Sequence, residues 1–125
     1  MSSGKHLICD IKNIKNHTLL NSMDGLKSMF EHICTTYDFN ILNKAEYQFT
    51  PQGITIIYML SESHISIHTF PEKNYAAMDI YTCREYPNND VYTEIQEYLK
   101  KMFESSDEKF TIIERKYETS KDNYS

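Results

Sequence analysis

Residues 54–83 read ITIIYMLSESHISIHTFPEKNYAAMDIYTC. Runs rich in β-branched and aromatic residues, which are typical of strands, occupy positions 54–60, 63–70 and 75–83. Ser61 and Glu62 separate the first two runs, and the turn-forming residues 71–74 separate the second from the third. We therefore predict three neighbouring antiparallel strands at the centre of the fold.

The two turns also predict how these strands pair. Partner residue numbers should sum to about 123 across the first turn and to about 145 across the second, so Thr55 lies opposite His68 and Glu62 lies opposite Cys83. Directly paired residues point to the same face of a sheet. One face of the sheet should therefore carry reactive and aromatic side chains, and the opposite face should carry the apolar Ile65 and Ile67. The residues expected on the reactive face are Thr55, His64, His68, Phe70, Asp79 and Cys83.

The flanking sequence predicts the remaining elements. Apolar residues at helical spacing predict one helix with a stripe from Leu19 to Tyr37 and another with a stripe from Val91 to Met102. Extended segments are expected at 5–12, 39–42, 47–50 and 110–114, and a frayed polar tail at 118–125. The predicted fold is a single α+β domain over residues 1–125. It is a two-layer sandwich with two helices packed on one face of an antiparallel sheet.

Composition limits the classes of partner and compartment. The 125 residues include 13 basic and 18 acidic side chains, and a formal net charge of −5 argues against nucleic acid as the main partner. The longest apolar run, 54–60, is too short to cross a membrane, and the first six residues lack the apolar core of a secretory signal. We therefore expect a cytoplasmic protein that does not associate with a membrane. Three cysteines without a C-x-x-C pair argue against a disulfide framework or a structural zinc site, and Cys34 is interpreted as a core residue.

The residues on the reactive face leave several interpretations open. The face could be an ordinary polar surface with scattered histidines. A zinc site built from His64, His68 and Cys83 is disfavoured, because residues four apart on a strand lie roughly 13 Å from each other. A cysteine–histidine nucleophile pair would need an oxyanion hole that the sequence does not mark.

Several motifs occur here together. Glu62-Ser63-His64, His68-Thr69-Phe70-Pro71-Glu72 and Asp79-Ile80-Tyr81-Thr82-Cys83 follow one another in order, with Gly4-Lys5-His6-Leu7 and Pro51-Gln52-Gly53-Ile54 before them. In this order and spacing they resemble the prokaryotic-type S-adenosylmethionine decarboxylase proenzyme family, over about residues 4–115.

The resemblance implies a self-processing enzyme that makes its own cofactor. The chain would cleave itself between Glu62 and Ser63, giving a β chain of residues 1–62 and an α chain of residues 63–125. Ser63 would attack the preceding carbonyl, and β-elimination would leave a pyruvoyl group at the start of the α chain. That covalent cofactor would form a Schiff base with S-adenosylmethionine and accept electrons as carbon dioxide leaves. The product would be the aminopropyl donor for spermidine biosynthesis.

The resemblance also assigns roles to individual residues. His68 would supply the proton chemistry of processing with the hydroxyl of Thr55, and Cys83 would protonate the product. Phe49 and Phe70 would stack on adenine, and Glu72 would bind the ribose. The family forms homodimers whose sites are shared between protomers, and no metal is implied.

Three positions depart from the family pattern. Thr55 stands where serine is usual, Phe70 where tryptophan is usual, and Arg84 where glycine is common. The changed aromatic leaves open a basic amino acid such as ornithine or arginine as the substrate. A third alternative is an unprocessed, non-catalytic homologue that regulates a partner enzyme.

Overall fold

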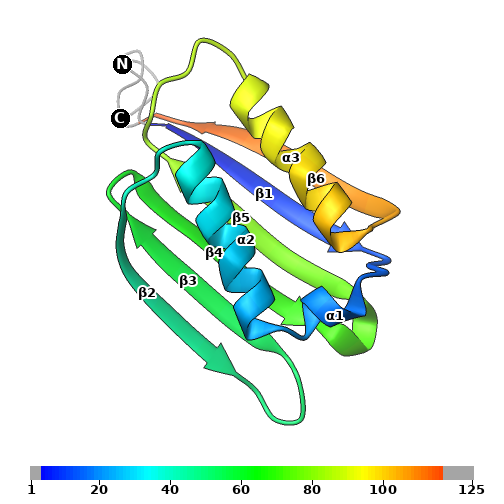
Figure 1. The fold of residues 1–125 in the computed structure, drawn as a ribbon. Coiled ribbons are helices and arrows are strands. Elements are labelled where there is room, and N and C mark those ends of the chain that lie inside the picture. Colours follow the sequence, from blue (N-terminus) through cyan, green and yellow to red (C-terminus); the bar gives the residue numbers. More distant parts are fainter. Residues whose placement is uncertain (1–3, 117–125) are drawn as a thin grey trace, which may run out of the picture.

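A six-stranded antiparallel sheet forms the centre of the structure, a computed structural model that describes residues 4–116. The strands lie in the order β2-β3-β4-β5-β1-β6. Their bounds are β1 Gly4–Lys12, β2 Ile41–Gln48, β3 Ile54–Leu60, β4 Ser63–Phe70, β5 Tyr75–Thr82 and β6 Asp107–Arg115 (Figure 1). The expected tail at 118–125 lies outside the described residues.

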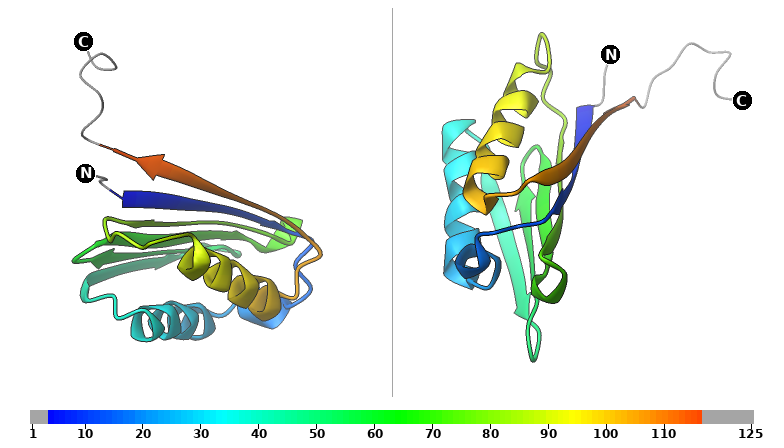
Figure 2. Two further views of the ribbon diagram at one scale, coloured as in Figure 1. Left: turned by 90° about the horizontal axis from the view of Figure 1, so that it is seen from above. Right: turned by 90° about the vertical axis from the view of Figure 1, so that its right-hand side faces the viewer.

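The helices cover one face of this sheet. They are α1 (His17–Leu20), α2 (Met23–Thr36) and α3 (Asp90–Phe103), and a 3-10 helix, η1 (Pro71–Lys73), joins β4 to β5. Figure 2 shows the helices on the same side of the sheet, with the opposite face uncovered. The predicted two-layer α+β fold is therefore confirmed. Among residues 4–116, no helix has the length and apolarity needed to span a bilayer.

A continuous apolar core lies between the sheet and the helices. Alternate residues of β3 and β4, including Ile56, Tyr58, Ile65 and Ile67, are fully buried against the helices. The helices contribute residues at a spacing of three or four, and those buried most completely include Leu26, Phe30, Ile33, Ile95, Leu99 and Phe103. Cys34 is buried in this core, as its interpretation predicts.

The register of the three central strands matches the prediction. Thr55 pairs with His68, and Leu60 pairs with Ser63 across the first turn. Across the second turn, Ser66 pairs with Asp79, and the same register pairs Ser63 with Thr82. The short turns allow few alternative registers, and the alternation of apolar and polar residues selects one of them.

Two expected elements differ from the structure. The single helix expected from Leu19 to Tyr37 is split, because Leu19 belongs to α1 while Ser22 caps α2 by accepting a hydrogen bond from the Gly25 amide at 2.9 Å. The two short strands expected at 39–42 and 47–50 form one continuous strand, β2, at the edge of the sheet. The side chains of β2 are mostly exposed and polar, so its sequence lacks the apolar pattern that is typical of a buried strand.

Candidate active site

The turn between β3 and β4 holds one group of predicted site residues. Ser61 and Glu62 form the turn, and Ser63 begins β4 with a φ of 151°. A positive φ of this kind is unfavourable for any residue that carries a Cβ, and such strained positions cost on the order of 1–3 kcal/mol. The peptide bond between Glu62 and Ser63 therefore lies at a strained point of an otherwise regular hairpin.

A backbone donor points at the carbonyl of this peptide bond. The Cys83 amide donates a hydrogen bond to the Glu62 carbonyl oxygen at 3.0 Å. An N–H in this place would stabilise negative charge on that oxygen if the carbonyl were attacked. The sequence gives no signal for this donor, because every residue except proline carries the same backbone amide.

Cys83 is also the most accessible thiol. Of the three cysteines, all of which lie within residues 4–116, Cys83 is exposed whereas Cys9 and Cys34 are buried. Burial raises the pKa of the Cys34 thiol to about 11 and raises the pKa of Cys9 further. The buried thiols therefore remain protonated and inaccessible, which leaves Cys83 as the cysteine available for chemistry.

A second group lies at the other end of β4. The Thr55 Oγ1 lies 3.0 Å from the His68 Nδ1, so the expected pair is hydrogen-bonded. These two residues line a cavity of about 340 Å³ together with the predicted substrate-binding residues Phe49, Phe70 and Glu72. Glu72 reaches the cavity from η1, and Phe49 from the loop after β2, where its amide donates to the Gly53 carbonyl at 2.8 Å.

The two groups do not meet within one chain. Ser63 and His68 are five residues apart on β4, which corresponds to about 16 Å along an extended strand. Ser63, Glu62 and Cys83 thus lie where β4 begins and β5 ends, and the register pairs Ser63 with the buried Thr82 on the helix-covered side of the sheet. Thr55, His68 and the cavity lie at the other end of β4. The predicted residues form two partial sites rather than one.

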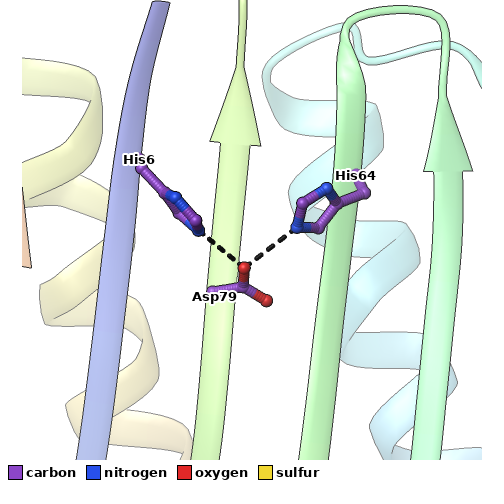
Figure 3. Close-up of side chains that lie close together, drawn as sticks. All are labelled: His6, His64 and Asp79. Carbon is purple, nitrogen blue, oxygen red and sulfur yellow. Dashed lines mark hydrogen bonds and ion pairs between the residues drawn. The ribbon is translucent and has the colours of Figure 1, made fainter. Parts of the chain in front are cut away.

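A third cluster surrounds Asp79 near the middle of the sheet (Figure 3). His6 on β1 and His64 on β4 approach the Asp79 Oδ2 from either side, at 2.7 Å and 2.9 Å from their Nε2 atoms. Ser66 donates to the other carboxylate oxygen. Burial raises the pKa of the Asp79 carboxyl, but the hydrogen bonds from Ser66, His64 and His6 outweigh it and hold the pKa below its ordinary value.

Three potential metal ligands meet in this cluster. His6, His64 and Asp79 place their ligand atoms within 4.8 Å of one another, a set different from the His64, His68 and Cys83 considered from sequence. Arg115 donates to the His6 Nδ1 at 3.1 Å, and a guanidinium has no acceptor. The His6 Nδ1 must therefore carry the lone pair and the Nε2 must carry the proton, so this arrangement suits a hydrogen bond to Asp79 rather than a metal–Nε2 bond.

Replacing Asp79 by asparagine tests this network. An ionised Asp79 with a lowered pKa stabilises the fold fully above the unfolded pKa near 3.9, and this contribution is lost as the pH falls through the lower folded value. We expect Asp79→Asn to reduce the free energy of unfolding by about 1–3 kcal/mol at pH 7, with a smaller difference at pH 3. Urea unfolding at both pH values measures this change. The control is Glu97→Gln, at an exposed ion pair of 3.8 Å with Lys100, which should change the free energy of unfolding little. An equal loss of stability by Asp79→Asn at both pH values would contradict the prediction.

Comparisons with known proteins agree with the motifs and the fold. The model of the S-adenosylmethionine decarboxylase family matches residues 5–116. The chain is 40% identical over 98 residues to the S-adenosylmethionine decarboxylase proenzyme of Methanococcus maripaludis strain C5, covering 78% of this chain and 80% of that protein. It is 40% identical over 114 residues to the corresponding proenzyme of Methanococcus aeolicus, covering 90% and 92%. The crystal structure of the adenosylmethionine decarboxylase from Aquifex aeolicus superposes with a TM-score of 0.79 at 25% identity, covering 96% of this chain and 98% of that one.

Proposed function

The chain belongs to the S-adenosylmethionine decarboxylase family, and we propose that it becomes active by cleaving its own Glu62–Ser63 peptide bond to create a pyruvoyl group. The reaction it then catalyses is the removal of carbon dioxide from S-adenosylmethionine, which yields the aminopropyl donor for spermidine biosynthesis. The observation that carries the cleavage proposal is the strained φ of Ser63 next to a carbonyl that the Cys83 amide polarises.

The cleavage proceeds through chemistry that the turn supports. The Ser63 Oγ attacks the Glu62 carbonyl carbon, the peptide C–N bond breaks, and the hydroxyl proton passes to the released nitrogen, giving an ester. Negative charge develops on the carbonyl oxygen that accepts the Cys83 amide hydrogen bond. Loss of the Ser63 α-proton then breaks the ester and expels Glu62 as a carboxylate. Water displaces the former Ser63 nitrogen as ammonia, which leaves the keto group of the pyruvoyl. Release of backbone strain at Ser63 favours the first of these steps.

The residues of the two partial sites have different roles in decarboxylation, substrate binding and proton transfer. The pyruvoyl ketone supplies the electron sink for decarboxylation. Cys83, exposed beside the scissile bond, delivers the proton that replaces carbon dioxide. Phe49 and Phe70 hold the adenine between their rings, Glu72 accepts hydrogen bonds from the ribose, and Thr55 with His68 moves the proton during processing.

A homodimer would unite these partial sites. We infer that the Ser63 end of one protomer meets the His68 end of its partner, since the two ends lie far apart along β4 in a single chain, in a sheet that helices α1, α2 and α3 cover on one face only (Figure 2). Apolar side chains exposed on β3 and at the cavity support the burial of this face by a second copy, namely Ile57, Met59, Phe49 and Phe70.

Mass spectrometry of the intact purified protein tests the cleavage. We expect two fragments that divide at Glu62/Ser63, with the second lacking a free amino group and reacting with a hydrazine through its ketone. Carbon dioxide release from S-adenosylmethionine, with ornithine and arginine as comparison substrates, then tests the activity. A single persistent mass of 14.8 kDa in an active preparation would overturn the pyruvoyl mechanism.

Removing the aromatic ring at position 70 should weaken substrate binding. Phe70 is 38% exposed beside the cavity, so part of its ring is available to a planar ligand, while Tyr75 stacks on the ring at a centroid distance of 5.6 Å. We expect Phe70→Ala to raise KM about tenfold with a smaller change in kcat, because ring stacking contributes on the order of 1 kcal/mol beyond the buried area. Leu42→Ala, at an exposed position on β2, is the control. An unchanged KM for Phe70→Ala would remove this residue from the proposed site.

A further inference from the structure

Arg84 joins two separate segments of the chain. Its Nη1 donates to the Tyr37 carbonyl at 2.6 Å, and its Nη2 donates to the Asp38 carbonyl and to the Glu62 Oε2, the latter at 2.7 Å. Its guanidinium also lies over the Phe39 ring, 5.1 Å from the centroid. The side chains of Arg84 and Glu62 are 30% and 14% exposed, so solvent screens this ion pair only in part.

The end of α2 explains why a cation is stabilised at this place. Helix α2 ends at Thr36 with Tyr37 as its cap, and Asp38 follows in the left-handed conformation with a φ of 59°. Carbonyls at a helix C-terminus lack partners within the helix and carry partial negative charge. The last turn of α2, which lies within the described residues 4–116, contains no basic residue. Arg84 therefore supplies this cation from another part of the sequence.

Glu62 is fixed through both its side chain and its backbone. Its carboxylate accepts hydrogen bonds from Arg84 and from the Asn40 amide, the latter at 3.3 Å. Its carbonyl accepts the Cys83 amide, and the preceding Ser61 amide donates to the Asn40 carbonyl at 2.9 Å. Burial raises the pKa of the Glu62 carboxyl, but the hydrogen bonds from Arg84, Ser61 and Asn40 hold the pKa below its usual range, so the group is ionised at neutral pH.

We propose that Arg84 is a positioning residue for self-cleavage, which holds the Glu62 side chain so that the Glu62 carbonyl stays aligned with the Cys83 amide. This inference rests on the cleavage proposed above. Consecutive residues hold the two groups of Glu62, since Cys83 binds the carbonyl through its amide and Arg84 binds the carboxylate through its side chain. Loss of the carboxylate anchor leaves the scissile carbonyl free to turn away from its donor, and a misplacement of about 1 Å can slow a positioned reaction by up to about a hundredfold.

The test measures the rate at which newly made chains cleave themselves. Wild-type protein and the variants Arg84→Ala, Arg84→Lys and Glu62→Gln are synthesised in a cell-free system with labelled methionine, chased, and separated on denaturing gels. We expect Arg84→Ala to cleave about 10- to 100-fold more slowly than wild type. Arg84→Lys should fall between them, because an ammonium can pair with Glu62 but cannot bond all three oxygens in the planar geometry of a guanidinium. Lys27→Ala removes another ion pair between α2 and the sheet, Lys27–Glu46 at 2.7 Å, and should cleave at the wild-type rate.

Two further measurements distinguish positioning from a general loss of structure. Adding ethylguanidinium at millimolar concentration should restore much of the cleavage rate of Arg84→Ala, because the added cation can occupy the site of the lost side chain. The variant Arg84→Ala/Glu62→Gln should be no slower than the slower single variant, since both substitutions break one contact.

Each outcome bears on the proposal in a defined way. Cleavage of Arg84→Ala at the wild-type rate would overturn the role of Arg84 while leaving the cleavage itself intact. A slow Arg84→Ala that ethylguanidinium does not restore, together with a Glu62→Gln that cleaves normally, would also overturn it. A wild-type chain that never cleaves would instead overturn the proposed function from which the inference starts.

Discussion

Substitution of Ser63 by alanine is expected to yield a single intact chain of 14.8 kDa that folds normally and lacks decarboxylase activity. Alanine has no hydroxyl to attack the Glu62 carbonyl, so neither the ester nor the pyruvoyl group can form. Because the electron sink for decarboxylation is lost with the cofactor, we expect activity to fall by at least about a thousandfold. The position keeps its strained φ of 151° with either residue, so the stability of the intact chain should change little.

The measurements for this variant are intact mass, thermal unfolding and carbon dioxide release. Ser66→Ala is a matched control, because Ser66 lies on the same strand and bonds to Asp79 rather than to the turn. That variant should still give two fragments. Carbon dioxide release by Ser63→Ala at the wild-type rate would show that the chain uses a different electron sink.

Co-expression of two inactive variants is expected to restore activity if a dimer shares its sites. Neither Ser63→Ala nor His68→Ala should process or decarboxylate alone, and loss of a general acid–base histidine costs about 10²- to 10⁴-fold. A mixed dimer would carry one site with Ser63 from one protomer and His68 from its partner. Random pairing makes half of the dimers mixed, each with one intact site of two, so activity should recover to about a quarter of the wild-type value.

Mass spectrometry adds an independent readout to the co-expression experiment. In a shared site, the fragments should derive only from the chain that retains Ser63, with cleavage assisted by the His68 of its partner. If Ser63 and His68 act within one protomer, mixed dimers contain no intact site, and neither fragments nor activity should appear. The separation of five residues along β4 makes the first outcome the expected one.

Local sequence signals were sufficient for the three central strands. Turns of two and four residues limit the pairing of Thr55 with His68 and of Ser66 with Asp79, and the alternation along 63–70 selects the uncovered face. The family motifs then identified which residues on this face to consider, and the fold and the family were confirmed. The roles of the individual site residues remain predictions.

Long-range contacts were not predictable in the same way. Nothing in the local pattern of 4–12 indicates that β1 lies between β5 and β6, so the approach of His6 to Asp79 was missed. The sequence marks Arg84 only as a departure from the glycine that is common at this position in the family. Its partners Tyr37 and Asp38 lie more than forty positions away, and only the fold brings them together.

The interleaving of the sheet has a consequence for the life of the mature enzyme. The proposed cleavage after Glu62 would leave β1, β2 and β3 on one fragment and β4, β5 and β6 on the other, yet β1 is inserted between β5 and β6, and β3 is paired with β4. The fragments can separate only if three ladders open together, so dissociation should be slow. Once apart, however, they must find each other by diffusion, and recovery becomes dependent on concentration. The intact chain would fold as a unimolecular process, whereas the processed enzyme should persist through a kinetic barrier and should form again only slowly from its separated fragments.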